Sequence, residues 1–258
     1  MRGYLFDRPD GRDEAFRLGS SSAFRLGDSA ALPKSYSLAV EYVNPRDQVG
    51  ESCVGFSTSV ALRVAYIRQL GKDPGEFSAF DAYYKSRAVW GGQDKDQGTY
   101  LRTTFRALQL LGCALERKWP STDIRGINKA PSWSAQKSAH RYRGIRGYYP
   151  IPVGTPQTLT LVKLALSHKL PVVGGWHIGS EFRNYDGRGA IGPAADPDAG
   201  HAYWIEAFYE DGTFGIFNSV VKIGAHRTWG RDGRATVTPE HVQSAHVLWA
   251  VAVEDKHA

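Results

Sequence analysis

Four residues of this 258-residue chain have the types and settings needed for nucleophilic attack on a carbonyl group. Cys53 directly precedes a helical pattern, and Gln48 lies five residues upstream of it. His201 begins an expected strand, and Asn218 ends the following one. A thiol, a base, an amide that orients the base and a donor for the developing oxyanion together form a catalytic set.

Cys53 is placed where a thiol becomes more acidic. The first turn of a helix exposes the sulfur to unpaired N–H groups and to the positive end of the helix dipole. A nearby histidine cation lowers the pKa further, and reactive cysteines reach roughly 3.5 to 7.5. A single cysteine before a helix is common and usually inert, so the argument for reactivity depends on its partners.

The hairpin that carries His201 and Asn218 brings these two residues together. A turn at Glu210–Gly212 places them within about two positions of facing each other, which is within side-chain reach. The asparagine oxygen then fixes one imidazole nitrogen, and the other nitrogen faces the thiol. Gln48 is predicted to donate its side-chain N–H to the oxyanion, with the backbone N–H of Cys53 as the second donor.

The other seven histidines have no such setting, and their spacing fits no metal-site template. We therefore predict no metal and no cofactor. His177 lies in an apolar strand, where it is either a core residue or part of the lining of a cleft. Surface or packing positions are expected for His140, His168, His226, His241, His246 and His257.

Helical periodicity dominates the first half of the chain and strands dominate the second, which predicts an α+β fold with segregated lobes. A helix is expected from Ser52 as N-cap to Gly71, a second over Thr99–Leu111, and a third starting at Thr155 and Pro156. Residues 120–145 are expected to be an irregular crossing between lobes. Strands are expected at Pro171–His177, His201–Tyr209, Thr213–Asn218 and Val247–Val253.

Composition indicates a soluble globular protein, with 42% hydrophobic and 22% charged residues. The net charge of +6 mildly favours acidic partners, but the basic residues are scattered. The densest patch, His140–Arg146, is interpreted as a solvated loop because no nucleic-acid motif accompanies it. There is no evident signal peptide and no apolar run of membrane-spanning length. We therefore expect a cytoplasmic protein or part of a non-secreted assembly.

The two cysteines, Cys53 and Cys113, do not form a disulfide framework. A bond between them would consume the proposed nucleophile, so both are expected to be reduced. Cys113 is expected to be a small buried apolar residue.

Residues 1–34 differ from the rest in being rich in Gly, Ser and Arg, and they contain a short duplication, AFRLG at 15–19 and 23–27. We predict an extended arm lying on a peptidase domain at 35–258. Its helical lobe is expected at about 48–120 and its β lobe at about 145–255. Docking of a protein partner on the arm is a weaker alternative.

These motifs resemble the papain-like cysteine peptidase family, in a bacterial or phage-type member. The segment 47–57, DQVGESCVGFS, is similar to the family's nucleophile motif. GHA at 200–202 and FNS at 217–219 resemble the base and orienter motifs. His201 lies 148 residues after Cys53, within the family spacing of about 130 to 150. Asn218 lies slightly farther from Cys53 than this family spacing, and an insertion near residues 180–198 explains the difference.

The resemblance implies a two-lobed fold and a thiol peptidase that works through a Cys-His-Asn triad and an acyl-enzyme. Cys53 is then the nucleophile, His201 the general base and acid, Asn218 the orienter and Gln48 the oxyanion donor. Peptides or proteins are the implied substrates. The implied substrate-binding residues are Gly98 and Thr99, through short β-pairing, and Ala199, in the pocket for the side chain two before the cut.

Several positions depart from the family pattern. Gln48 is one position closer to the cysteine than usual, and Val54 replaces an aromatic residue. Val220 replaces the Trp that normally shields the Asn–His bond, and Trp229 with Gly230 is a candidate substitute. The arm is much shorter than a typical inhibitory propeptide.

Two other functions compete with the peptidase. These departures motivate a catalytically weak or inactive module in a larger assembly such as a phage particle, although all four catalytic residue types are retained. Transfer of the acyl group to an amine is also consistent with a Cys–His pair. Transglutaminase-like enzymes generally orient the base with Asp, so Asn218 favours the peptidase.

Overall fold

The computed structural model describes residues 3–8, 10, 32–223 and 227–255. The helices are α1 (Cys53–Leu70), α2 (Ala79–Ala88), α3 (Leu101–Leu111), α4 (Trp133–His140), α5 (Thr158–Ser167), α6 (Ser180–Arg183) and α7 (Pro239–Gln243), with 3₁₀ turns at Glu116–Lys118 and Ile124–Gly126. The strands are β1 (Tyr36–Ser37), β2 (Ile145–Ile151), β3 (Val172–Ile178), β4 (Ala190–Ile191), β5 (Ala199–Phe208), β6 (Phe214–Phe217), β7 (Lys222–Ile223), β8 (Arg227–Thr228), β9 (Arg234–Val237) and β10 (Val247–Val253).

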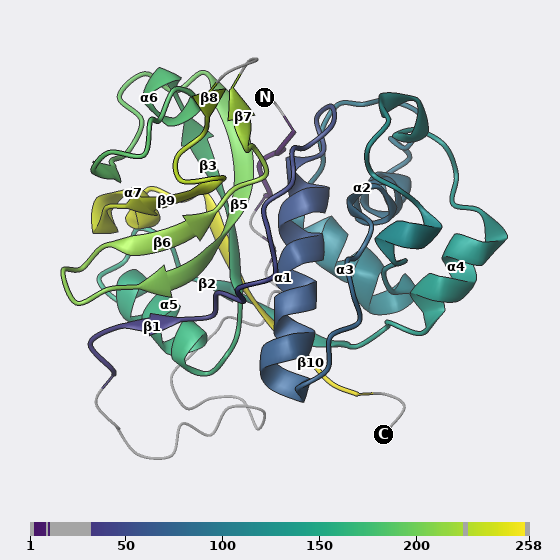
Figure 1. The fold of residues 1–258 in the computed structure, drawn as a ribbon, viewed down its shortest axis with the longest axis horizontal. Helices are drawn as coiled ribbons and strands as arrows, with labels where there is room; N and C mark the ends of the chain where they lie inside the picture. The colour runs from purple at the N-terminus through teal and green to yellow at the C-terminus, as the bar shows by residue number, and fades with distance from the viewer. Residues whose placement is uncertain (1–2, 9, 11–31, 224–226, 256–258) are drawn as a thin grey trace.

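Helix α1 lies between two differently built halves. Figure 1 shows α2, α3 and α4 on one side of it and the strands β5, β6 and β9 on the other. The main sheet has the order β2-β10-β3-β5-β6-β9-β4, with β1 paired to β5. All its pairings are antiparallel except that of β4 with β9. The predicted α+β class is confirmed.

Helix α1 begins at the cysteine and ends at a glycine, as the sequence predicted. Gly71 adopts φ 66° and its N–H bonds to the Ile67 carbonyl, a left-handed stop that a side chain would strain. Ser52 is the N-cap residue, as predicted, but its side chain does not cap the helix, because its hydroxyl donates to the Val49 carbonyl at 2.6 Å instead. The first N–H groups of α1 are thus left without a side-chain cap from Ser52.

The hairpin of β5 and β6 has the predicted register. Trp204 pairs with Phe217, so Asn218 follows opposite Tyr203, two positions from His201. On its other side β5 pairs with β3, where His201 lies opposite Trp176. The central strands are buried along their length, which fixes the register because a slip would expose their apolar side chains.

Three predicted boundaries need correction. Helix α5 begins at Thr158 and not at Thr155–Pro156, because the hydroxyl of Thr158 bonds to the Pro152 carbonyl at 2.8 Å and closes a turn before the helix. The crossing at 120–145 is not wholly irregular, since it contains α4 with Ser132 as its cap. Helix α2 was not predicted, because Asp81, Lys85 and Arg87 are buried in it beside its apolar residues and no apolar stripe results. None of the described helices is long and apolar enough to cross a membrane.

A buried ion pair in α2 has a large expected effect on stability. Lys85 Nζ lies 2.6 Å from Asp81 Oδ2, and the two side chains are 7% and 0% exposed. Asp81 also accepts the Ala114 N–H at 2.6 Å. We expect Asp81→Ala to lower the free energy of unfolding by about 3 to 5 kcal/mol, because it leaves the lysine charge uncompensated. Urea denaturation measures this loss.

The exposed pair Asp123–Arg125 is the matched control, with side chains 49% and 83% exposed. Asp123→Ala should leave the urea midpoint close to that of the unmodified chain, because water screens the pair. Equal losses for Asp81→Ala and Asp123→Ala would contradict the structural role given to the buried pair.

Candidate active site

Cys53 is the first residue of α1 and is fully buried. The backbone amide of Ala202 lies beside its sulfur and stabilises the thiolate form, and Ala202 directly follows His201 on β5. Helix α1 therefore delivers its N-terminal sulfur to the strand that carries the histidine. The contact joins the helical half of the molecule to the sheet.

His201 and Asn218 form the predicted hydrogen bond. His201 Nε2 and Asn218 Oδ1 are 2.7 Å apart, and both side chains are buried. The same Oδ1 accepts the Ser219 N–H at 2.8 Å, and the Asn218 N–H donates to the Gly233 carbonyl, which fixes the asparagine. Among the described residues, His201 Nδ1 has no hydrogen-bond partner. One ring nitrogen is thus held, and the other is free for a proton transfer.

Gln48 is tied to the segment that follows Asn218. Its N–H donates to the Ser219 carbonyl at 2.7 Å, and its side-chain oxygen accepts the Ser219 hydroxyl at 2.8 Å. Its side-chain nitrogen donates to the Gly50 carbonyl at 3.0 Å. Since the amide nitrogen carries two N–H groups, one of them remains for a ligand.

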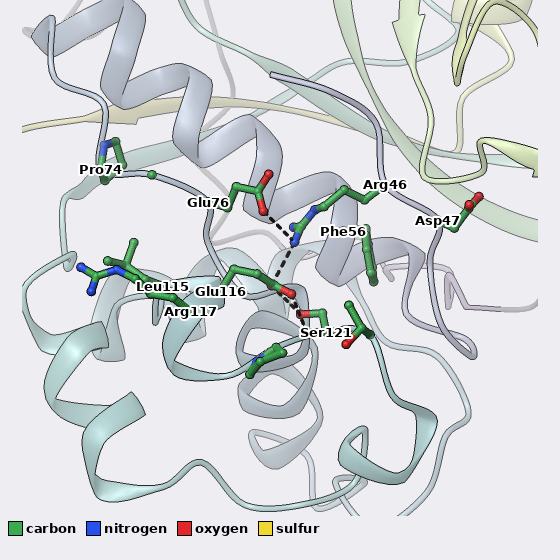
Figure 2. Close-up of a pocket in the computed structure, with 12 residues that line it drawn as sticks. Arg46, Asp47, Phe56, Pro74, Glu76, Leu115, Glu116, Arg117 and Ser121 are labelled. Atoms are coloured by element: carbon green, nitrogen blue, oxygen red, sulfur yellow. Dashed lines mark hydrogen bonds and ion pairs between the residues drawn. The ribbon is translucent and has the colours of Figure 1, made fainter. Parts of the chain in front are cut away.

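A cavity of about 490 Å³ lies behind this glutamine loop, and Figure 2 shows the ion pairs that line it. Arg46 Nη1 lies 3.0 Å from Glu116 and 3.6 Å from Glu76. The Arg46 guanidinium also stacks 5.2 Å from the Phe56 ring on α1. These contacts of Arg46 anchor the residues before Gln48 to the helical half and thereby hold the glutamine loop in place.

Burial keeps the thiol and the imidazole neutral in this structure. It raises the pKa of Cys53 to about 12, partly offset by the Ala202 amide. It lowers the pKa of His201 to about 4, against the hydrogen bond that the ring donates to Asn218, which raises it. At neutral pH the Cys53 thiol and the His201 imidazole are therefore both uncharged.

The burial comes from the N-terminal segment, which crosses the front of Cys53. A Cβ placed on Gly3 would lie 2.9 Å from the sulfur, so only glycine fits there. The Thr99 N–H donates to the Gly3 carbonyl at 3.1 Å, and the Leu5 N–H donates to the Thr99 carbonyl at 2.9 Å. In Figure 1 this purple segment lies between α1 and β5.

Aromatic side chains anchor the segment on both sides of Leu5. The Tyr4 ring is 2% exposed and lies against the sheet, and the Phe6 ring lies 4.1 Å from the His177 ring. His246 Nε2 hydrogen-bonds the Asp7 carbonyl at 3.1 Å. His177 is exposed and is therefore not a core residue. Most of the predicted arm, residues 11–31, lies outside the described residues.

The aromatic ring that packs on His201 was not predicted from the sequence. Phe182 of α6 lies edge-on to His201 at 5.6 Å, and Trp229 packs behind it at 5.0 Å. The Trp229 indole N–H donates to the Phe182 carbonyl at 2.5 Å. Phe182 therefore makes the contact with the His201 ring, and Trp229 packs against Phe182. Phe182 belongs to the predicted insertion near 180–198, and nothing in that stretch marked it for this position.

The remaining predicted site residues are placed as follows. Gly98 adopts φ 81° and its N–H donates to the Tyr83 hydroxyl at 2.8 Å, which presents Thr99 to the arm. Ala199 lies on the same face of the strand as His201, because alternate residues face opposite sides, and the neighbouring Gly200 faces the arm.

Cys113 is buried and forms no bond with Cys53. Among the described residues there is no cluster of His, Cys, Asp or Glu that could hold a metal.

Three solved structures are similar to this chain over most of its length. Xylellain, a cysteine protease from Xylella fastidiosa, is 22% identical over 98% of this chain and 96% of its own, with a TM-score of 0.77. Procathepsin B S9 from Trypanosoma congolense is 16% identical over 99% and 87%, with a TM-score of 0.76. Digestive procathepsin L 3 of Tenebrio molitor larval midgut is 17% identical over 93% and 74%, with a TM-score of 0.69.

The chain therefore has the papain-like fold, as the sequence predicted. No protein-family model matches the chain, and no curated protein matches its sequence.

Two buried histidines predict a loss of stability in acid. Burial lowers the pKa of His201 and of His241 to about 4, from an ordinary 6.5. Their contribution is therefore fully present above pH 6.5 and is lost as the pH falls toward 4. Between pH 7 and pH 5 each should cost about 2 kcal/mol of unfolding free energy.

Urea denaturation at the two pH values tests this loss. His241→Gln should retain about half of the pH dependence, since one of two similar groups remains. A chain equally stable at pH 7 and pH 5 would contradict the assignment of neutral, buried imidazoles.

Proposed function

We propose that this protein hydrolyses peptide bonds through Cys53. The observation that supports this most strongly is the 2.7 Å bond from His201 Nε2 to Asn218 Oδ1, which leaves Nδ1 free in the buried site of Cys53. Asn218 acts as the orienter and His201 as the base. Gln48 and the Cys53 backbone N–H donate to the oxyanion. Peptides are the substrate class, because the fold neighbours are proteases.

The reaction has two halves. His201 takes the thiol proton, and the sulfur attacks the peptide carbonyl carbon to form a tetrahedral oxyanion. The C–N bond breaks as His201 gives its proton to the leaving amine, and an acyl-enzyme remains. Water, deprotonated by His201, then attacks the thioester carbonyl and releases the acid and the thiol.

The arm holds this site in a latent state. It uses both the N–H and the carbonyl of Thr99, the groups proposed to pair with a substrate main chain. Arm and substrate therefore exclude each other. The arm also keeps the pair neutral by burial, and its departure admits water and allows a thiolate–imidazolium pair to form.

Covalent labelling tests the function. An epoxysuccinyl peptide should add once to the intact protein, and the adduct should map to Cys53. Cys53→Ala should abolish the adduct, whereas Cys113→Ala should retain it, because Cys113 is buried and its thiol donates to the Ser78 carbonyl. Labelling is measured by intact mass on the Tyr4→Ala variant, in which the arm is weakened, as well as on the unmodified chain.

The labelling also separates the alternatives. A Tyr4→Ala chain that forms no adduct and cleaves no protein substrate would support the non-enzymatic module. Incorporation of an added amine into the product, in preference to water, would support acyl transfer.

A further inference from the structure

One peptide group in the loop before Cys53 is held on both of its sides. The Gly50 carbonyl accepts the side-chain N–H of Gln48 at 3.0 Å. The Glu51 N–H, which belongs to the same peptide group, donates to both carboxylate oxygens of Asp96, each at 3.1 Å. Because a peptide group is planar, the carboxylate that fixes its N–H also fixes its carbonyl. Asp96 therefore determines where the amide nitrogen of Gln48 is held.

The loop is shaped to receive this carboxylate. Gly50 has φ 64°, and a Cβ placed on it would lie 2.3 Å from Asp96 Oδ2 and 2.8 Å from Ile127 Cδ1. A side chain at position 50 would be strained by the backbone and would push the carboxylate away from the Glu51 N–H. Glycine at this position allows the close approach.

Tyr83 of α2 joins the same carboxylate to the segment that carries Thr99. Its hydroxyl donates to Asp96 Oδ1 at 2.8 Å and accepts the Gly98 N–H at 2.8 Å. Burial, with the hydrogen bond to Asp96 adding to it, raises the pKa of the Tyr83 phenol, so the hydroxyl keeps the proton that it donates. One carboxylate and one hydroxyl thus connect the loop of the proposed oxyanion donor to the segment proposed to pair with the substrate.

A buried guanidinium holds both Tyr83 and the chain next to Asp96. The Arg87 side chain is fully buried and lies 3.9 Å from the centre of the Tyr83 ring. It donates to the Ile127 carbonyl at 2.6 Å and also to the carbonyl of Lys95, the residue before Asp96. The carboxylate is therefore supported by the helical half of the molecule and does not depend on the arm.

We propose that Asp96 positions Gln48 to bind the oxyanion, an inference that rests on the proposed peptidase function and deepens it. One N–H of the Gln48 amide is bound by the Gly50 carbonyl, so the direction of the second N–H follows from the position of that carbonyl. Without the carboxylate, the Gly50–Glu51 peptide group loses its fixed orientation, and so does this second N–H. The oxyanion forms only during the reaction, so the loss slows the chemical step and leaves binding of the uncleaved peptide nearly unchanged.

Asp96→Ala tests this role in the full chain carrying Tyr4→Ala, in which the arm is weakened. For a fluorogenic peptide, kcat should fall by about 10- to 100-fold because an oxyanion donor is misplaced, while KM stays within about threefold. Alkylation of Cys53 by iodoacetamide forms no oxyanion, so its rate should stay within about twofold. Asp96→Asn should recover most of kcat, because it keeps an oxygen that accepts the Glu51 N–H.

Asp94→Ala is the matched control, because Asp94 is an exposed carboxylate of the same loop. It should leave kcat within about twofold of the parent chain. A variant that is merely unstable loses peptide cleavage and Cys53 alkylation together, because fewer molecules are folded. Equal kcat for Asp96→Ala and Asp94→Ala, or a fall in alkylation rate as large as the fall in kcat, would overturn the proposal.

Hydrogen exchange keeps the role of Asp96 testable without catalysis. If the Tyr4→Ala chain cleaves no peptide, the peptidase function fails, and exchange of the Glu51 N–H is then measured by NMR. Asp96→Ala should speed this exchange by about 10-fold or more, because the N–H loses a charged acceptor. Faster exchange in Asp96→Ala but not in Asp94→Ala would support the positioning of the loop alone. Equal exchange in the two variants would overturn it.

Discussion

Tyr4→Ala should raise the rate at which iodoacetamide alkylates Cys53 at pH 7 by about 100-fold. The ring is 2% exposed, and removal of a buried aromatic side chain costs about 3 kcal/mol or more. This loss of free energy destabilises only the state in which the arm is bound. The fraction of molecules with an open cleft therefore rises by about 100-fold. Mass spectrometry of quenched time points gives the rate.

Tyr42→Ala is the control for this experiment. Tyr42 is 58% exposed, so its removal should leave the alkylation rate within about twofold of the unmodified chain. An unmodified chain that alkylates as fast as Tyr4→Ala would show that the arm does not cover Cys53 in solution.

His201→Ala, made in the Tyr4→Ala chain, should lower kcat/KM for peptide cleavage by about 10⁴-fold or more. Loss of one member of a catalytic triad has effects of this size, because the remaining groups cannot move the proton. The reduction should lie in kcat, since His201 makes no proposed contact with the bound main chain. Steady-state kinetics on a fluorogenic peptide measures both constants.

His241→Ala is the matched control, because His241 is another buried histidine of the same lobe. Its ring bonds to the Tyr203 hydroxyl and to the Gly192 carbonyl, and it lies outside the proposed machinery. With the fold verified by circular dichroism, it should retain most of the activity. Similar losses for both histidine variants would remove the special role of His201.

The hairpin that brings the proposed base and orienter together could be predicted from the sequence. A turn at Glu210–Gly212 fixes the offset of His201 and Asn218, because the register of a short hairpin follows from its turn. The cysteine at the start of α1 was equally legible, since Gly71 and an apolar stripe define that helix. Local patterns therefore located both halves of the site.

Other features depend on contacts that no local pattern encodes. The Tyr4 ring meets Gly175 far along the chain, and neither residue belongs to a motif. Phe182 reaches His201 from a four-residue helix that has too few residues to show a period. Helix α2 buries charged and polar side chains together with apolar ones, so its apolar residues form no stripe. These features require the tertiary structure.

The state of the Cys53 thiol in the open cleft tests the account most directly. The pH dependence of Cys53 alkylation is measured in the Tyr4→Ala chain and in the same chain with His201→Ala. An activated pair predicts an inflection well below the ordinary thiol pKa of about 8.5, and a return toward about 8.5 when the imidazole is removed. An inflection near 8.5 in both chains would contradict the proposal that His201 activates Cys53.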